Sequence, residues 1–460
     1  MSRERETNKK LTLFALTWPI LIEVLLHMLM GNADTLMLSQ YSDNSVAAVG
    51  VSNQLFSFVI VMLGFIVTGT SILISQQLGA KHYKEARHVV VVSLATNLLF
   101  GLVLSVGLFF LSPLLLQLMN IPNELMKEAV IYLRVVGAFS FVQAMIMTIS
   151  AVLRSYGFSK DAMYITIGMN IINVVGNYLF IFGPFGFPVL GVTGVAIATV
   201  TSRTIGLIIF VLLLYKRMDN QLPLSYLFTV PKKELSALVK IGVPSAAEQL
   251  SYNISQIVIT YFIASMGTQA LTTKVYTQNI MMFILLFSFA IGQGTQILIG
   301  HQVGAKKYED AYKQCIRSLN IALVLTVIIG FIFYMMSGPF FGIFTDNQEI
   351  IALGTSLILL SLLLEPGRAF NLIVLNGLRA AGDVKFPVYI GVVSMWGVSV
   401  ALSYLLGIKF GLGLIGIWIA FTADEWLRGL LMLWRWRGRK WQRMSFVSEK
   451  EEQREVAATK

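Results

Sequence analysis

The feature of this sequence that most restricts its fold is a set of apolar runs long enough to cross a lipid bilayer. Residues 46–77 and residues 89–120 contain no charged side chain. Either run, as a helix that rises about 1.5 Å per residue, covers the roughly 30 Å of bilayer hydrocarbon. Backbone groups must be paired within hydrocarbon, and the alternating pattern of a membrane barrel is absent. These runs therefore predict transmembrane helices.

The composition is typical of a membrane protein, since 56% of the 460 residues are hydrophobic and only 13% are charged. A soluble core of this length does not need so much apolar surface. We predict an all-α membrane protein with twelve transmembrane helices. They span residues 11–40, 46–77, 89–120, 129–153, 162–183, 189–215, 237–264, 269–302, 316–344, 350–378, 386–406 and 411–434.

The net charge of +11 is explained by orientation in a membrane. With twelve spans both termini lie on one side, and most of the 35 Lys and Arg residues fall there, in the N-terminal segment, the even-numbered loops and the C-terminal tail. Only Lys127, Lys274 and Lys409 lie at the opposite face. The positive-inside rule then places both termini in the cytoplasm and the chain in the cell (inner or plasma) membrane, against anionic lipid. No nucleic-acid partner is needed.

The second half of the chain repeats the first. Residues 69–86 recur at 294–311 with eleven of eighteen positions identical, and the same register, without a gap, places Glu23 on Glu248. Each copy holds six spans, an even number, so the copies share one orientation and predict two pseudo-symmetric six-helix lobes around a central cleft. The predicted parts are a cytoplasmic N-terminus (1–10), an N-lobe (11–215), a cytoplasmic inter-lobe linker (216–236), a C-lobe (237–434) and a cytoplasmic basic tail (435–460), expected to be disordered.

Four carboxylates fall in the first, seventh and tenth predicted spans, Asp34, Glu23, Glu248 and Glu365, while Asp424 and Glu425 lie toward the cytoplasmic half of the twelfth. Such groups are costly in hydrocarbon and usually face a bundle interior or a watery cavity. Asp34 is the best candidate for ion coupling, because a carboxylate in a low-dielectric site can exchange a proton or bind a cation. The alternative interpretation is an interfacial Asp satisfied by backbone or water. The only metal expected is Na⁺ at Asp34, if sodium is the coupling ion.

Three asparagines, Asn170, Asn173 and Asn177, share one face of the fifth predicted span at spacings of three and four. Their carboxamide oxygens can coordinate a cation or orient a proton carrier. They can equally join helices through interhelical hydrogen bonds.

Other polar residues in the spans have two interpretations each. Glu23 and Glu248, each four residues after a proline, predict either a shared structural task or two cavity-facing acids that attract cationic substrates. Glu365 and Arg368, one turn apart, can pair with each other or contribute to an ion or substrate site. His27, close to one turn beyond Glu23, can titrate near neutral pH or serve as a hydrogen-bonded core residue.

Several motifs together resemble those of the multidrug and toxic compound extrusion family. They are Asn32-Ala-Asp34-Thr in the first span, Gly-Ala-Lys after the second span of each lobe, and Leu378-Arg-Ala-Ala-Gly-Asp383 after the tenth span. The resemblance covers essentially the whole chain. It implies an antiporter, not an enzyme, that works as a monomer without a cofactor. Such a protein exports small amphipathic, often cationic organic compounds in exchange for inward H⁺ or Na⁺, by alternating access of two lobes.

The resemblance also implies roles for single residues. In archaeal-type members the position of Asn177 is commonly Asp, and Asn173 and Thr199 match other members of an N-lobe ion site. With Asn at this position, Asp34 is the only acid of the site, which argues against a two-acid proton relay. The family's C-lobe sodium site pairs acids in the seventh and tenth spans. Here Tyr252 stands at the seventh-span position, so that match is imperfect.

The nearest rival function is a lipid or polysaccharide-precursor flippase of the same broader superfamily. A flippase would need a strongly basic cavity for phosphate, whereas intramembrane arginines are few and the central acids favour cationic cargo. A membrane-embedded enzyme would need a nucleophile with a base or a metal cluster, and the sequence has neither pattern. It also lacks a Gly-rich phosphate loop, so an ion gradient rather than ATP is expected to drive transport.

Overall fold

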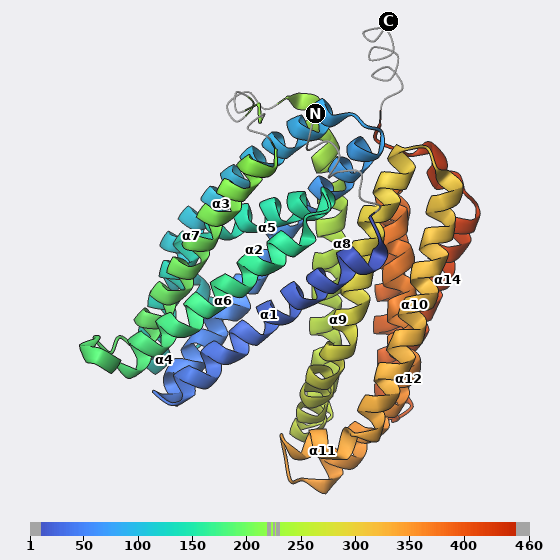
Figure 1. Ribbon diagram of the computed structural model, residues 1–460. Coiled ribbons are helices and arrows are strands. Elements are labelled where there is room, and N and C mark those ends of the chain that lie inside the picture. The colour runs from blue at the N-terminus through green and yellow to red at the C-terminus, as the bar shows by residue number, and fades with distance from the viewer. Residues whose placement is uncertain (1–10, 219–221, 224–225, 227–230, 448–460) are drawn as a thin grey trace, which may run out of the picture. The chain divides into compact units, whose positions relative to one another are not determined.

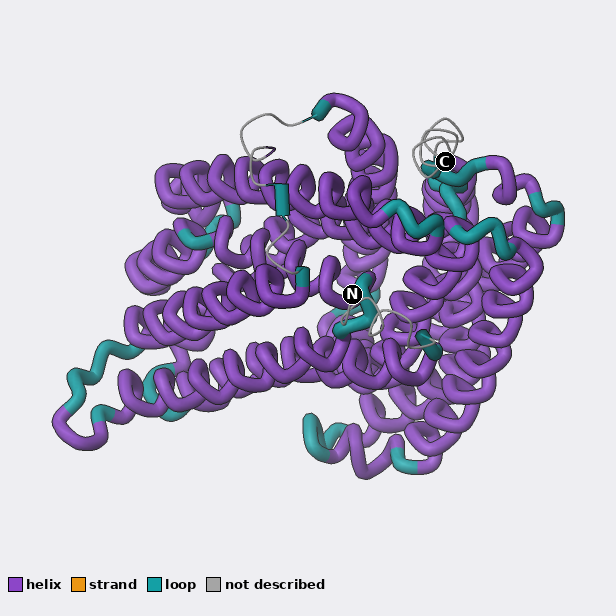
Figure 2. The backbone as a smooth tube through the Cα atoms, turned by 45° about the horizontal axis from the view of Figure 1, so that its top comes forward, coloured by secondary structure: helices purple, strands orange, loops and turns teal. Residues whose placement is uncertain are grey.

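The computed structural model describes residues 11–218, 222–223, 226 and 231–447, and its regular structure over these ranges is helical (Figure 1, Figure 2). The first half contains α1 (Leu13–Ser39), α2 (Asp43–Gly79), α3 (Tyr83–Leu118), α4 (Asn123–Ala138), α5 (Ser140–Ser155), α6 (Ser159–Phe182) and α7 (Val192–Arg217). The second half contains α8 (Lys232–Ser265), α9 (Thr268–Gly304), α10 (Tyr308–Met335), α11 (Ser337–Gly342), α12 (Gln348–Ala380), α13 (Lys385–Ser394) and α14 (Gly413–Arg437).

Each predicted span is matched by one helix or by a bent or irregular helical run. α4 and α5 together form the fourth span and meet at an angle of 47°. α13 continues through π-helical turns to Lys409 as the eleventh span. Over the described ranges, nine helices are long and apolar enough to cross a membrane, or ten with the bent pair. α8 and α14, which carry more charge, are the other two spans. The predicted all-α, twelve-helix layout is confirmed.

The repeated Gly-Ala-Lys motif forms the same turn in both halves of the chain. Lys81 follows the end of α2 with a φ of 64°, and Lys306 follows the end of α9 with a φ of 57°. A left-handed residue just beyond a helix is a common way to stop it. The sequence repeat is therefore also a repeat of one helix–turn–helix element.

The chain folds into two compact units. Among the described residues, unit 1 comprises 18–74 and 82–242, and unit 2 comprises 11–17, 75–81 and 243–447. α1 and α8 change unit at equivalent positions of the repeat, just before Pro19 and Pro244. Each of these prolines removes one helical hydrogen bond at that point. The lobe limits predicted from sequence, at residues 215 and 237, remain predictions.

Each unit has a core of buried apolar side chains. The core of unit 1 joins α2, α4 and α7 and includes Leu63, Leu133 and Val195. One core of unit 2 joins α9, α10, α12 and α14. It includes the fully buried Trp436 and Trp441, whose stacked rings lie 4.2 Å apart. Aromatic rings of this size bury more apolar area than other core side chains.

The expectation that the tail is disordered is wrong for residues 435–447. α14 continues to Arg437, and a short 3₁₀ helix follows at Lys440–Arg443. Trp441 Nε1 donates a hydrogen bond of 2.8 Å to the backbone oxygen of Trp436. The many basic residues of this segment led to the prediction of disorder, although its tryptophans are buried. Residues 448–460 and most of the predicted linker's centre lie outside the described residues.

Candidate functional site

Four polar residues of unit 1 form one buried hydrogen-bonded chain. Asp34 comes from α1, Asn173 and Asn177 from α6, and Thr199 from α7. Asn177 Nδ2 donates to Asp34 Oδ1 at 2.5 Å and lies 3.4 Å from Asn173 Oδ1, while Asn173 Nδ2 donates to Thr199 Oγ1 at 3.3 Å. Asp34 is 4% exposed and the other three side chains are buried more completely. The structure thus brings together the four residues that sequence reasoning assigned to one site.

Local sequence explains how α6 and α7 meet at this chain. Asn173 and Asn177 are four residues apart, so they project from one face of α6. α6 ends at Gly183, whose φ of 64° is a left-handed conformation that glycine adopts without strain. The short connection that follows returns the chain as α7, which packs along α6 and presents Thr199 to the asparagines.

Further residues lie around this chain, and the sequence did not place them there. Tyr132 of α4 contacts Thr199 and donates its hydroxyl proton to Asn53 Oδ1 of α2 at 3.2 Å. Arg203, one turn after Thr199 on α7, is an electrostatic neighbour of Asp34. A lone Tyr or Asn in an apolar span does not reveal which neighbouring helix it faces, so the sequence carried no signal for these contacts.

This arrangement links one acid to two neutral carboxamides and one hydroxyl, with Arg203 as its charged neighbour. Carboxylate, carboxamide and hydroxyl oxygens are the ligands that hard cations accept. Asn177 Oδ1 is buried and, among the described residues, accepts no hydrogen bond. Ionised Asp34 accepts a hydrogen bond from Asn177 Nδ2 as observed. Protonated Asp34 could instead donate to Asn177 Oδ1 after rotation of the amide.

Two predicted residues do not join this chain. Asn170 Nδ2 donates at 2.8 Å to the backbone oxygen of Thr166, one turn earlier on α6. His27 lies on α1 with an exposed side chain, so it does not belong to the buried core.

Glu23 and Glu248 each pair with an arginine at an equivalent position of the repeat. Arg154 Nη1 lies 2.8 Å from Glu23 Oε2 in unit 1, and Arg379 Nη2 lies 2.5 Å from Glu248 Oε2 in unit 2. Ser150 Oγ donates a further hydrogen bond of 2.7 Å to Glu23 Oε1. Both acids are buried and neutralised within their own unit. Of the two interpretations drawn from sequence, this geometry favours the shared structural task.

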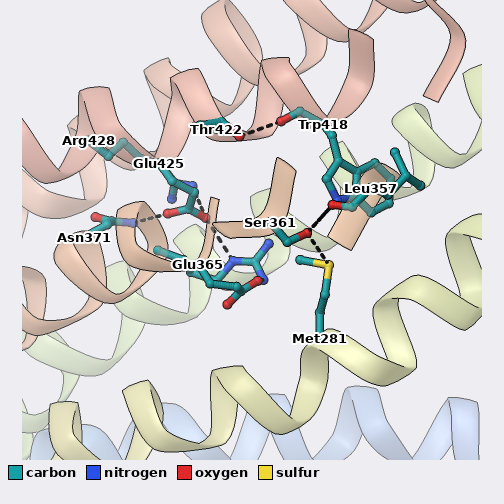
Figure 3. Close-up of polar contacts among 10 residues, drawn as sticks. Met281, Leu357, Ser361, Glu365, Asn371, Trp418, Thr422, Glu425 and Arg428 are labelled. Carbon is teal, nitrogen blue, oxygen red and sulfur yellow. Dashed lines mark hydrogen bonds and ion pairs between the residues drawn. The ribbon is translucent and has the colours of Figure 1, made fainter. Parts of the chain in front are cut away.

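A larger ionic cluster lies in unit 2 between α12 and α14 (Figure 3). Arg368 Nη1 lies 2.7 Å from Glu365 Oε1, and Arg368 Nε lies 3.6 Å from Glu425 Oε1. Arg428 Nη2 lies 3.0 Å from the same Glu425 oxygen and 2.6 Å from Asp424 Oδ2. The expected contact between Glu365 and Arg368 is present, but it is one part of a network that Glu425 holds together.

This cluster contains three carboxylates and only two guanidinium groups, so one carboxylate has no guanidinium of its own. Glu365 is fully buried, and its Oε2 has no hydrogen-bond partner among the described residues. A cavity of about 30 Å³ borders the cluster and is lined by Tyr252, Arg368 and Glu425 among others. A cavity of this size has room for a water molecule or a small cation rather than organic cargo.

Comparison with known proteins assigns the chain to a family. The MatE family model matches residues 19–179 and 244–405, once in each half of the repeat. The uncharacterized transporter YisQ of Bacillus subtilis is 55% identical over 438 residues, which cover 95% of this chain and 96% of that protein. The probable multidrug resistance protein NorM of Thermotoga maritima is 28% identical over 446 residues, which cover 96% and 95% of the two chains.

Solved structures share the fold. The crystal structure of MATE in the bent conformation superposes with a TM-score of 0.85 at 20% identity, covering 93% of this chain and 94% of the other. An outward-facing multidrug resistance MATE transporter of the MOP superfamily gives a TM-score of 0.85 at 21% identity, covering 93% and 95%. Taken with the family match in both halves, these findings show that this chain is a multi-pass membrane transporter of the MatE, or multidrug and toxic compound extrusion, family.

Proposed function

We propose that this protein is a secondary active antiporter that exports amphipathic, cationic organic compounds in exchange for inward H⁺ or Na⁺, and that Asp34 binds the coupling ion. The observation that carries the proposal is the buried chain from Asp34 through Asn177 and Asn173 to Thr199. A single acid held among neutral amide and hydroxyl groups changes its net charge whenever it gains or loses one monovalent cation. Such a change of charge inside the membrane is what couples an ion gradient to a conformational cycle.

Both coupling ions fit the residues of this chain. A sodium ion would take ligands from the Asp34 carboxylate and from the oxygens of Asn173, Asn177 and Thr199. A proton would reside on Asp34, and the Asn177 amide can hydrogen-bond with both the charged and the neutral form of the acid. Because Asn rather than Asp stands at position 177, the site compensates one positive charge and not two.

The charges of unit 2 support cationic rather than anionic cargo. The buried Arg428 and the partly buried Arg368 and Arg379 are each engaged by a carboxylate of their own unit. They therefore do not offer the free basic groups that a flippase for phosphate-bearing lipids or polysaccharide precursors would need. The flippase remains the alternative function that the test below distinguishes.

The test is efflux of ethidium from proteoliposomes in which an inward H⁺ or Na⁺ gradient is imposed separately. We expect one of the two gradients to drive export by the wild type and Asp34→Asn to abolish it. Asp43→Asn, which removes an exposed acid at the start of α2, is the matched control and should retain export. If neither gradient moves any cationic compound, the flippase becomes the better assignment. If Asp34→Asn exports normally, coupling belongs to another group, with Glu365 the first to examine.

A second comparison separates the two ions. With Na⁺ coupling, Asn173→Ala and Thr199→Ala each remove a ligand oxygen and should raise the Na⁺ concentration for half-maximal export several-fold. With H⁺ coupling, the same substitutions leave the export rate independent of Na⁺. An export rate that responds to Na⁺ but is unchanged in both variants would contradict the proposed ligand set.

A further inference from the structure

Unit 2 contains a cavity of about 370 Å³ that none of the polar sites above uses. Its walls come from the first turns of α1, from α9 and from α10, with Leu13 and Ile291 on the first two helices. Ligand sites in proteins typically measure about 300–1,000 Å³, so this cavity lies near the lower limit of that range. It can hold a small molecule or part of a larger one.

One face of α10 gives the cavity a polar end and an apolar end. Gln314, Arg317, Ile321 and Leu325 all line it, at spacings of three, four and four residues. Residues at these spacings form a continuous stripe along a helix. From Arg317 to Leu325 the stripe extends about 12 Å along the helix axis. A molecule lying against it would meet a cation at one end and only aliphatic side chains at the other.

The charge of the cavity selects an anion. Arg317 is the only ionisable residue in its lining, its side chain is exposed, and it makes no ion pair with the described part of the chain. Arg317 therefore differs from Arg368, Arg379 and Arg428, each of which pairs with a carboxylate of unit 2. This cavity does not suit the cationic cargo proposed above, and a fixed positive charge favours a phosphate group.

The position of Arg317 suggests the source of that phosphate. It stands at the start of the ninth predicted span, at the edge where the basic loops of the chain lie. Pockets that combine a basic residue with apolar walls at the cytoplasmic boundary of transmembrane helices bind anionic lipid head groups. We infer that this cavity binds an anionic phospholipid of the cytoplasmic leaflet, with the phosphate at Arg317 and one acyl chain along Ile321 and Leu325.

The experiment is native mass spectrometry of the full-length protein released from nanodiscs that contain phosphatidylglycerol or phosphatidylcholine. The wild type should retain one phosphatidylglycerol in preference to phosphatidylcholine. Arg317→Gln should lower the apparent affinity for phosphatidylglycerol about five-fold, the effect of one basic residue near an anionic membrane surface. Lys313→Gln removes an exposed charge from the preceding turn, outside the cavity lining, and should have no such effect.

A second pair of variants tests the volume rather than the charge. Leu325→Trp fills the apolar end of the cavity and should reduce phosphatidylglycerol retention with Arg317 intact. Val324→Trp places the same side chain on the exposed face of α10 and should not reduce it. Equal retention in Arg317→Gln and Lys313→Gln would overturn the inference. So would a rise in retention after deletion of residues 2–9, which would make the N-terminal segment the occupant. The readout needs no transport, so it is independent of the antiport proposal.

Discussion

Replacing Glu23 by Gln tests whether the repeated Glu–Arg pairs are structural or cavity-facing. Arg154 donates to Glu23 at 2.8 Å and Ser150 donates at 2.7 Å, and the side chains of Arg154 and Glu23 are only 14% and 6% exposed. Glu23→Gln leaves a mostly buried guanidinium without its counter-charge. Removing one partner of a buried ion pair typically lowers the free energy of unfolding by about 3–5 kcal/mol. The structural interpretation predicts a loss in this range.

A double-mutant cycle isolates the contribution of the pair. Arg154→Gln alone strands the carboxylate, whereas the double variant with Glu23→Gln leaves two neutral amides. We expect the double variant to be more stable than the sum of the single losses predicts, by about 1.5 kcal/mol or more, the energy of a hydrogen bond to a charged group. The measurement is denaturant unfolding in detergent micelles, with ethidium binding measured in parallel.

The equivalent pair in unit 2, Glu248 and Arg379, allows a second test of the same interpretation. Leu375 stands where the repeat would place the counterpart of Ser150, so Glu248 has one hydrogen bond fewer than Glu23. Glu248→Gln should therefore cost about 1 kcal/mol less than Glu23→Gln. Unchanged unfolding of every variant in both cycles, together with weakened ethidium binding, would refute the structural interpretation and make the two glutamates substrate-binding acids.

Three further predictions concern the cytoplasmic end of unit 2 as the sequence orients it. A methyl group on Gly79 would overlap the backbone oxygen of His301 on α9, so Gly79→Ala should lower stability by about 1–3 kcal/mol in thermal unfolding. Gly107→Ala, which meets nothing within 4 Å, should not. Trp441→Ala should cost about 3–5 kcal/mol, because the side chain is fully buried. Gln76→Leu removes the acceptor of the Phe446 backbone N–H at 2.8 Å, and hydrogen exchange at that amide should accelerate.

The transmembrane layout could be predicted from the sequence because it depends on length and polarity alone. The charge-free run at 46–77 forms most of α2, and its helix could be predicted without knowing which helices pack beside it. The face shared by Asn173 and Asn177 followed from helical spacing. The residues opposite that face could not be predicted from the spacing. Tyr132 and Asn53 come from other helices, and the spacing within one helix does not determine how helices pack.

The ionic cluster of unit 2 shows the same limit. Glu365 and Arg368 are neighbours on one helix, so their pairing could be expected, but the bridge through Glu425 joins α12 to α14 and depends on how those helices pack. The prediction of a disordered tail was wrong for a different reason. Its composition is polar and basic, yet two tryptophans decide its structure, because burying aromatic area outweighs the solvation of the charges between them.

The internal repeat provides a criterion that separates scaffold from site within one chain. Features present in both copies, such as the Glu–Arg pairs and the Gly-Ala-Lys turns, serve what both units need, which is to hold six helices together. Features without a counterpart are where the copies have specialised. The register of the repeat places Ile259 opposite Asp34 and Leu402 opposite Asn177, so among the described residues the Asp34–Asn177 pair has no copy in unit 2. Since an unneeded buried acid is costly in a membrane, its retention in one copy alone supports an ion-binding role rather than a structural one.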